Sequence, residues 1–305
     1  MFNHIYQKPK VIAEIGCNHM GKFDIALELI DLAKSCGAGY AKFQKRTPKE
    51  LLTDDQYNAP HPNPHNSYGH TYGEHREFLE FDRNQHEALM IYCRKIGIEY
   101  STSVWDVTSA QEIISINPKF IKIPSACNNH YEMLEVLRDT YTGQIHISLG
   151  MTTHKEEHKL ISFFEEKGDA KTRLVVYACT SGYPVPDDEM ALLEIKRLYD
   201  VYGDRVSEIG FSGHHNGIAL DIAAYTLGAR WIERHFTKDR TWKGTDHAAS
   251  LEKPGMEKMI RDLNGAYKAL TYKTEEILEI EAPQREKLKF RNEKPNKDHH
   301  RPSGI

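Results

Sequence analysis

The feature that most constrains the fold of this chain is a regular alternation of short β-rich runs with amphipathic helical stretches. The β-rich runs are VIAEIG, GYAKFQ, IEYSTS, KFIKIPS, QIHISLG, RLVVYACT, VSEIGFS and ARWIERHF. Between each run and the next lies a stretch whose apolar residues recur at helical spacing. A chain that repeats strand and helix in this way is expected to form a parallel sheet covered by helices.

Eight such units in roughly 270 residues predict a closed (β/α)8 barrel, the TIM-barrel form of the α/β class. The alternative is an open doubly wound sheet, which often binds a dinucleotide at a glycine-rich turn after its first strand. The corresponding turn here, GCNHMG, lacks the G-x-G-x-x-G spacing, and this favours the barrel. We assign residues 1–280 to the barrel domain. Residues 281–305 are expected to be a basic, flexible tail, because NEKPNKDHHRPSGI offers almost nothing to bury.

A long polar insert, at about residues 47–76, interrupts the alternation between the second and third runs. One interpretation is a solvated loop with a few packed aromatic residues. The other is a lid over the substrate, because loops of this length in compact domains are often functional. The residues that would then meet a distal phosphate are drawn from Lys45, Arg46, His70 and Arg76.

Composition argues against several classes of protein. The formal net charge is −4, with 17 histidines counted as neutral, so no basic face for nucleic acid is expected. The five cysteines form no C-x-x-C motif, which is typical of a reduced, cytoplasmic protein. The first residues, MFNHIYQKPK, hold no apolar signal-peptide core, and no apolar run approaches the roughly 18 residues of a membrane span.

Polar side chains gather where the β-rich runs end, and in a barrel of this type the chemistry takes place at the carboxyl ends of the strands. Those positions hold Glu14, Lys42, Gln44, Thr102, Lys122, Ser125, Ser148, Ser181, Tyr183, Ser212, His214, Glu233 and His235. Lys42 and Lys122 are notable, because a charge within an apolar strand is costly to bury unless it is paired. Each lysine either pairs with a buried carboxylate or joins the serine hydroxyls in binding a phosphate and a carboxylate of a small anionic substrate.

His214 and His235 follow consecutive runs and are therefore expected to be neighbours in space. Each is either a structural histidine or one of two ligands of a shared metal ion. Two imidazoles suit Mn²⁺, Fe²⁺, Co²⁺ or Zn²⁺, and water, substrate oxygens, Asp246 or Glu14 would complete the coordination. A metal ion with an open position can polarise a carbonyl group.

These residues lie in stretches that resemble the sialic acid synthase family, whose members condense phosphoenolpyruvate with amino sugars to make nonulosonic acids. The matching stretches are AEIGCNHMGKFDIALELIDLAKSCGAGYAKFQ, IKIPS, ISLGM, CTSGYPVP, GFSGHHNGIAL and GARWIERHFTKDRTWKGTDHAASLE, within about residues 10–280. Together with TYGEHREFLEF, they look most similar to the eukaryotic branch of the family, which makes N-acylneuraminate 9-phosphates.

The resemblance implies a role for each residue that matches a family motif. The positions that match the phosphoenolpyruvate site are Lys42, Thr102, Lys122, Ser125, Ser148, Ser181, Tyr183 and Ser212. His214 and His235 match the metal ligands, and the ion expected there is Mn²⁺ or Mg²⁺. Glu14 matches the glutamate at the reacting centre, and Asp246 matches an acid near the metal and the sugar. Gln44, at the end of the second run, is expected to be a further substrate contact.

The implied reaction makes the chain a carbon–carbon bond-forming transferase. The metal makes the aldehyde carbon of an open-chain amino sugar, such as N-acetylmannosamine or its 6-phosphate, electrophilic. The enol carbon of phosphoenolpyruvate attacks that carbon. Water oriented by the metal or by Glu14 adds to the carbon that bears the phosphate, and phosphate leaves. The resemblance also implies a homodimer, because family members associate through their barrels.

Two departures from the family bear on the sugar half of the site. Family members carry a small C-terminal antifreeze-like domain, which we do not expect the tail of this chain to form. The stretch KIPSAC stands where the family has K-x-G-S-G and then an acid that faces the sugar, so Cys127 replaces that acid. A thiol does not accept hydrogen bonds as a carboxylate does. We therefore expect an acceptor sugar that differs from N-acetylmannosamine or is bound differently.

Two other functions are compatible with the pattern. A metal-dependent aldolase or a 3-deoxy-octulosonate-type synthase would share the barrel, the metal and the carbonyl chemistry. A barrel that binds phosphoenolpyruvate and metal without turnover would share the binding residues. Release of phosphate separates a synthase from an aldolase, and any turnover excludes the non-catalytic barrel.

Overall fold

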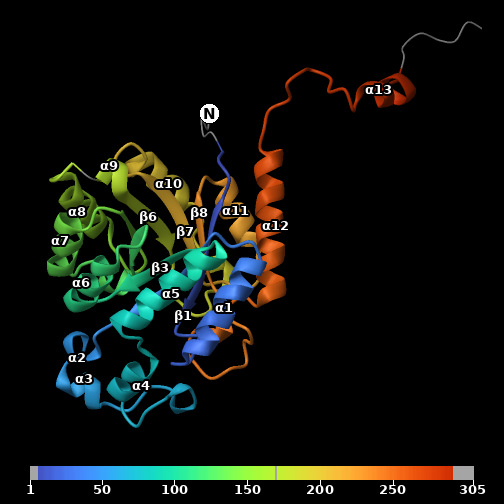
Figure 1. Cartoon of the computed structure of the whole chain (residues 1–305). Helices are drawn as coiled ribbons and strands as arrows, with labels where there is room; N and C mark the ends of the chain where they lie inside the picture. Colours follow the sequence, from blue (N-terminus) through green and yellow to red (C-terminus); the bar gives the residue numbers. More distant parts are fainter. Residues whose placement is uncertain (1–5, 169, 291–305) are drawn as a thin grey trace, which may run out of the picture. The chain divides into compact units, whose positions relative to one another are not determined.

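The computed structural model describes residues 6–168 and 170–290, and its centre is a closed barrel of parallel strands surrounded by helices (Figure 1). The eight strands follow one another around the barrel in chain order. Strand β8 pairs with β1, with Glu14 opposite His235, so the sheet has no free edge. The predicted (β/α)8 barrel is therefore confirmed, and the open doubly wound sheet is wrong.

Each predicted β-rich run contains one strand. The strands are β1 (Lys10–Gly16), β2 (Tyr40–Lys45), β3 (Glu99–Val104), β4 (Phe120–Ile123), β5 (Gln144–Ser148), β6 (Leu174–Cys179), β7 (Glu208–Gly213) and β8 (Trp231–His235). The longer helices are α1 (Phe23–Ser35), α5 (Arg83–Ile96), α6 (Val107–Ile116), α7 (Tyr131–Thr140), α8 (His154–Glu165), α10 (Glu194–Tyr202), α11 (Ala219–Thr226) and α12 (Lys253–Ala269). Shorter helices are α2 (Pro48–Leu51), α3 (Asp54–Asn58), α4 (Tyr72–Leu79), α9 (Ala170–Arg173) and α13 (Ala282–Leu288).

Local sequence signals set the ends of α5, the helix that precedes β3. The Asp82 side chain accepts a hydrogen bond from the backbone N–H of Gln85, which satisfies a free donor of the first turn. The helix ends at Gly97, whose φ of +77° is in the left-handed region that glycine adopts without strain. The chain thus turns directly into β3.

The interior of the barrel changes character along the strands. Towards their amino ends it is filled by a packed cluster of Ile12, Phe120, Val175, Tyr177 and Trp231. Towards their carboxyl ends the inward positions carry ionisable and hydroxyl side chains instead. The apolar cluster closes the amino end of the barrel, so a substrate can reach the polar residues only from the carboxyl end.

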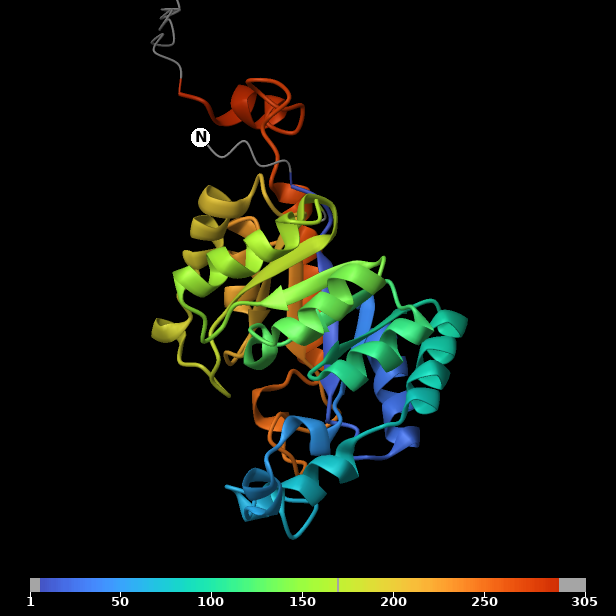
Figure 2. The same cartoon turned by 90° about the vertical axis from the view of Figure 1, so that its left-hand side faces the viewer.

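The polar insert forms α2, α3, α4 and a 3-10 turn, η1 (Pro64–Asn66). In both views it lies at one end of the barrel, beside the loop that follows β8 (Figures 1 and 2). The hydroxyl of Tyr68 donates to the carbonyl of Lys243, and the backbone N–H of Gly244 donates to Asn66 Oδ1 at 3.4 Å. The insert is therefore fixed to the loop after β8.

The chain divides into two compact units, one ending at Lys268 and the other beginning at Ala269. The boundary predicted at residue 280 lies within the second unit, which contains α13. Of the predicted tail, residues 291–305 lie outside the described residues. Among the described residues, no helix is long and apolar enough to cross a membrane.

Candidate active site

A cavity of about 640 Å³ opens at the carboxyl ends of the strands. Most of the predicted site residues line it, although they come from all parts of the barrel. Those residues are Glu14, Lys42, Gln44, Lys122, Ser125, Ser148, Ser181, Tyr183, Ser212, His214, His235 and Asp246. The closed barrel brings these strand ends together around one space.

Two buried ion pairs form the floor of the cavity. Lys42 Nζ contacts Glu14 Oε2 and lies 3.8 Å from Glu233 Oε1. Lys122 Nζ lies 3.1 and 3.0 Å from the two carboxylate oxygens of Glu233. Each lysine therefore pairs with a buried carboxylate, and each also faces the cavity. The two interpretations of the lysines drawn from the sequence are thus compatible with each other.

The sequence predicts no role for Glu233, although this residue lies near the end of the last β-rich run. Its carboxylate also accepts a hydrogen bond from the Ser212 hydroxyl at 3.1 Å, so it joins β8 to residues of β2, β4 and β7. The sequence contains a signal for Glu233, because this residue is a charge within an apolar strand, as Lys42 and Lys122 are. Its partners were not visible, because they lie more than a hundred residues away in the chain or on another strand.

The environment moves the pKa values of the two glutamates in opposite directions. Burial raises the pKa of Glu14 to about 7, with the negative charge of Glu233 adding to the effect and Lys42 opposing it. Burial also raises the pKa of Glu233, but Lys122 and Lys42 outweigh it and lower the value to about 2. Glu14 can therefore gain or lose a proton near neutral pH, while Glu233 stays charged. Paired groups separated in this way are typical of acid–base sites.

A group of small and hydroxyl residues lies beside the lysines. The Ser125 hydroxyl accepts a hydrogen bond from the backbone N–H of Gly150 at 3.0 Å. A Cβ atom on Gly150 would lie 2.4 Å from Ser181 Oγ and 2.8 Å from Ser125 Oγ, so only glycine fits there without a shift. Ser148 and Ser212 line the same cavity. Hydroxyls and lysines around one space suit a phosphate group.

His214 and His235 lie side by side, with ring centroids 5.5 Å apart. His214 Nδ1 lies 3.0 Å from the Thr180 carbonyl, which can only accept, so Nδ1 carries a proton and Nε2 is the nitrogen left to bind a metal ion. His235 Nδ1 is buried without a hydrogen-bond partner and lies 3.8 Å from Asp246 Oδ2. Tyr183 packs against His214 at 4.4 Å between ring centroids.

These donors fit a divalent metal ion whose coordination is completed from outside the protein. Within residues 6–168 and 170–290, no group of three or more His, Cys, Asp or Glu side chains is arranged to hold a metal ion. An orphaned nitrogen on His235 and a fixed tautomer on His214 are nevertheless the features expected of imidazole ligands. Two protein ligands leave open positions for substrate or water oxygens.

Two predicted site residues do not line the cavity, which corrects the prediction from the sequence. Thr102 is on the outer side of β3, in register with Phe43 and Ile121, and its hydroxyl donates to the carbonyl of Ser103 at 3.4 Å. Because side chains alternate along a strand, Ser103 lines the cavity in its place.

The second correction concerns Cys127, which was expected to face the sugar. Cys127 is the last residue of the 3-10 turn η2 (Ser125–Cys127), and its side chain is 5% exposed and part of the hydrophobic core. Pro124 and Ala126 line the cavity at this point instead. The expectation that Cys127 alters the acceptor sugar therefore loses its structural basis.

The outer wall of the cavity comes from the insert and from the end of β2. Arg46 stacks on Trp105, with 4.0 Å from its guanidinium carbon to the ring centroid, and pairs with Glu80 at 3.2 Å. Arg76 donates to the Tyr72 hydroxyl at 3.0 and 2.6 Å. Arg76 makes no ion pair with a carboxylate of the described chain. The two other candidates for a distal phosphate, Lys45 and His70, do not line the cavity.

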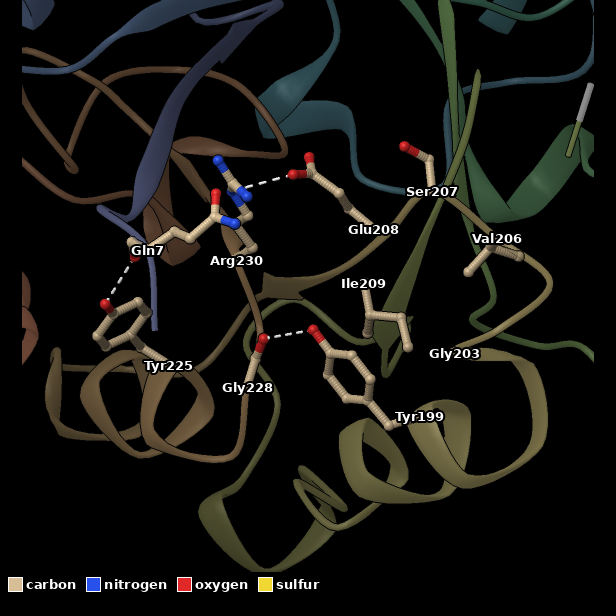
Figure 3. Close-up of a pocket in the computed structure, with 10 residues that line it drawn as sticks. All are labelled: Gln7, Tyr199, Gly203, Val206, Ser207, Glu208, Ile209, Tyr225, Gly228 and Arg230. Atoms are coloured by element: carbon tan, nitrogen blue, oxygen red, sulfur yellow. Dashed lines mark hydrogen bonds and ion pairs between the residues drawn. The ribbon is translucent and has the colours of Figure 1, made fainter. Parts of the chain in front are cut away.

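A second cavity, of about 190 Å³, lies at the amino ends of β7 and β8 (Figure 3). There Arg230 pairs with Glu208 at 3.0 Å, and the hydroxyls of Tyr225 and Tyr199 donate to backbone carbonyls at 2.8 and 2.7 Å. These side chains use their polar groups to hold the barrel together. We therefore place the active site in the larger cavity.

The profile of the NeuB family matches residues 29–275 of this chain. The chain belongs to the NeuB family. It is 35% identical to human N-acetylneuraminate-9-phosphate synthase over 281 residues, which are 91% of this chain and 76% of the human protein. It is 28% identical to N,N'-diacetyllegionaminic acid synthase of Campylobacter jejuni, over 87% of this chain and 78% of that protein.

Among solved structures, this NeuB family member is similar to an N-acetylneuraminic acid synthetase from Leptospira borgpetersenii, crystallised in complex with citrate. The TM-score is 0.77 at 26% identity, and the match covers 92% of this chain and 91% of that one. The resemblance to sialic acid synthases is confirmed, and with it the prediction of a carbon–carbon bond-forming transferase. The relatives are synthases of sialic acids and related nonulosonic acids.

Proposed function

We propose that this protein condenses phosphoenolpyruvate with an open-chain amino sugar, giving a 2-keto-3-deoxy sugar acid of the nonulosonic type and inorganic phosphate. The observation that carries the proposal is the convergence, in one cavity, of two lysines, five serines, a glutamate with a pKa near 7 and a pair of histidines. The lysines and serines suit the binding of anionic phosphoenolpyruvate. The glutamate suits the transfer of a proton, and the histidines suit a metal ion that would activate an aldehyde.

Lys42, Lys122 and the serines bind phosphoenolpyruvate. Burial disfavours the charge on Lys42, but Glu14 and Glu233 outweigh it and raise the pKa of the ammonium group. A permanently charged, positioned ammonium group holds the substrate's anionic groups and stabilises the phosphate as it leaves. It is also a poor Schiff-base amine, which argues against an aldolase that uses Lys42.

His214 and His235 would hold a divalent ion, Mn²⁺ or Mg²⁺, and that ion would supply Lewis-acid activation of the aldehyde. The enol carbon of phosphoenolpyruvate forms the new bond with the electron pair of its double bond, and the aldehyde oxygen takes a proton. Glu14 removes a proton from the water that adds to the carbon bearing the phosphate. The bond from that carbon to the phosphate oxygen then breaks, phosphate leaves with the electron pair, and the remaining hydroxyl becomes the ketone.

Arg46 and Arg76 favour an acceptor with a phosphate at its distal end, such as N-acetylmannosamine 6-phosphate. Arg46 has Glu80 as a partner, whereas Arg76 faces the cavity and, among the described residues, donates hydrogen bonds only to the Tyr72 hydroxyl. A guanidinium group in that position is suited to a phosphate, because the two form charge-assisted, bidentate hydrogen bonds.

The test is phosphate release from phosphoenolpyruvate with Mn²⁺ and a panel of aldoses. The panel contains N-acetylmannosamine, its 6-phosphate, mannose, arabinose 5-phosphate and 2,4-diacetamido sugars. We expect release with N-acetylmannosamine 6-phosphate, abolished by EDTA and restored by added Mn²⁺. His235→Ala should abolish it without unfolding the protein. Activity with arabinose 5-phosphate alone would assign a different 3-deoxy-ulosonate synthase, and turnover without phosphate release would assign an aldolase.

A further inference from the structure

A buried ion pair lies directly behind the two cavity histidines, on the outer side of the barrel. The side chains of Arg234 and Asp221 are both 0% exposed, and Arg234 Nη1 lies 2.5 Å from Asp221 Oδ2. Arg234 precedes His235 in β8, but it points away from the cavity, because side chains alternate along a strand. Asp221 is in the first turns of α11, next to β7 and β8 in Figure 1.

Arg234 joins the end of β8 to the loop that follows β7. Its Nη2 donates to the carbonyl of His215 at 2.6 Å, and its Nη1 donates to the carbonyl of Gly217 at 3.0 Å. His215 Nε2 lies 3.0 Å from the same Nη1 and 3.4 Å from Asp221 Oδ2. One guanidinium group thus holds both the backbone and the ring of the residue that follows His214.

The opposite side of His214 is fixed by the loop after β6. The backbone N–H of Val185 donates to the carbonyl of His214 at 3.0 Å, and His214 Nδ1 donates to Thr180. His235 is held by the backbone N–H of Leu251, which donates to its carbonyl at 2.8 Å. Two arginines run between the segments that carry the histidines. Arg240 Nη2 donates to Asn216 Oδ1 at 3.0 Å in an exposed position, whereas Arg234 is fully buried. Arg234 is therefore the buried link between the segments beyond the last paired residues of the sheet, Gly213 and Arg234.

Stability alone does not account for such a pair. Removing two charges from water costs about as much as their attraction returns, and well-packed apolar residues of similar volume are often as stable. What the guanidinium group provides is direction, since its planar donors reach Asp221 and two backbone carbonyls at once. Residues that orient metal ligands from behind usually have this kind of hydrogen bonding.

We infer that Arg234, held by Asp221, is a positioning residue that sets the separation of His214 and His235 and thereby the affinity of the site for a divalent ion. The inference rests on the proposed metal site. It concerns affinity rather than chemistry, because neither Arg234 nor Asp221 lines the cavity.

The experiment measures the dissociation constant of Mn²⁺ by electron paramagnetic resonance of the free ion, without substrate. The main variant is Arg234→Met/Asp221→Leu, which removes both charges and leaves neither unpaired. The matched control is Arg205→Met/Glu165→Leu, which removes a pair at 2.7 Å between the segment before β7 and the end of α8, at the amino ends of the strands. Arg234→Lys keeps a positive charge beside Asp221 but lacks the planar set of N–H donors that the guanidinium group provides. It also decides the question if the double variant does not fold.

We expect the Mn²⁺ dissociation constant to rise about 10- to 100-fold in the Arg234→Met/Asp221→Leu protein and less in Arg234→Lys. It should be unchanged in the control, and the affinity for phosphoenolpyruvate without metal should be unchanged in all three. A folded double variant that binds Mn²⁺ as tightly as the wild type would overturn the inference. A wild type that binds no Mn²⁺ would overturn the proposed metal site, and the inference with it. An equal loss of Mn²⁺ affinity in the control would show that removing any such ion pair loosens the fold, and it would also overturn the inference.

Discussion

The cavity at the carboxyl ends of the strands and the smaller cavity at the amino ends of β7 and β8 use the same kinds of residue. Each contains a glutamate and an arginine near a strand end, and each also contains tyrosines. They differ in what those residues bind. In the smaller cavity Glu208, Arg230 and the tyrosine hydroxyls bind one another or the backbone. In the larger cavity Arg76 makes no ion pair with a carboxylate of the described residues, and His235 Nδ1 is buried without a hydrogen-bond partner.

This difference distinguishes a ligand-binding site from a cavity whose polar residues only stabilise the fold. Buried polar groups are nearly always satisfied within a protein, so a cavity lined by unsatisfied ones calls for a ligand. The residue types alone indicate a candidate site in both cavities and do not distinguish them. The following predictions each compare one change in the larger cavity with a matched change in the smaller cavity or the apolar cluster.

The largest effect is expected for Glu14→Gln against Glu208→Gln. The amide keeps the shape of Glu14 but cannot take a proton from water, so kcat for phosphate release should fall about 10²- to 10⁴-fold. Glu208→Gln should leave kcat unchanged and lower the free energy of unfolding by about 1–3 kcal/mol, because Lys10 and Arg230 lose their partner. Steady-state kinetics and urea unfolding measure the two effects. Equal kinetics for both variants would contradict the assignment of Glu14.

A smaller effect is expected for Arg76→Gln against Arg230→Gln. Loss of the Arg76 guanidinium should raise KM for a phosphorylated acceptor about 10- to 100-fold, the value of a charge-assisted hydrogen bond. KM for phosphoenolpyruvate should not change. Arg230→Gln should lower the free energy of unfolding, because Glu208 loses a partner, and should change neither KM value. If KM for the unphosphorylated sugar rose equally in Arg76→Gln, the distal phosphate would not be what Arg76 binds.

The pH dependence of kcat/KM should follow the titration of Glu14 in the larger cavity. Burial, with the charge of Glu233, raises the pKa of Glu14 to about 7. The working form is the carboxylate, so kcat/KM should be highest above that pH and fall about tenfold per unit below it. Glu208→Gln should keep this profile. Residual activity of Glu14→Gln should lose the inflection, and persistence of the inflection would assign it to another group.

The smallest effect on kinetics is expected for Gly150→Ala against Gly210→Ala. A Cβ on Gly150 meets the hydroxyls of Ser125 and Ser181, so KM for phosphoenolpyruvate should rise several-fold. On Gly210 it meets the ring of Tyr177 at 2.6 Å in the apolar half of the barrel. That variant should lose about 1–3 kcal/mol of stability by overpacking and keep its KM. Thermal unfolding and initial rates, measured on the same samples, separate the two outcomes.

The sequence by itself determined the barrel and most of the residues at its active end. The alternation of runs fixes the strands and helices, and the interruption of apolar strands by Lys42 and Lys122 identifies the polar end. The fold then requires those strand ends to meet. Glu14, the serines and the two histidines could therefore be named before any contact was known.

Tertiary structure decided which side of a strand each residue occupies and what it pairs with. A shift of one residue turns a side chain to the other face, and so Ser103 lines the cavity while Thr102 does not. Lys122 and Glu233 are 111 residues apart in the chain, and only closure of the barrel makes them partners. The same holds for the insert that brings Arg76 to the cavity. Such long-range pairings leave no local periodicity, because they depend on strand register and barrel closure rather than on the residues beside them.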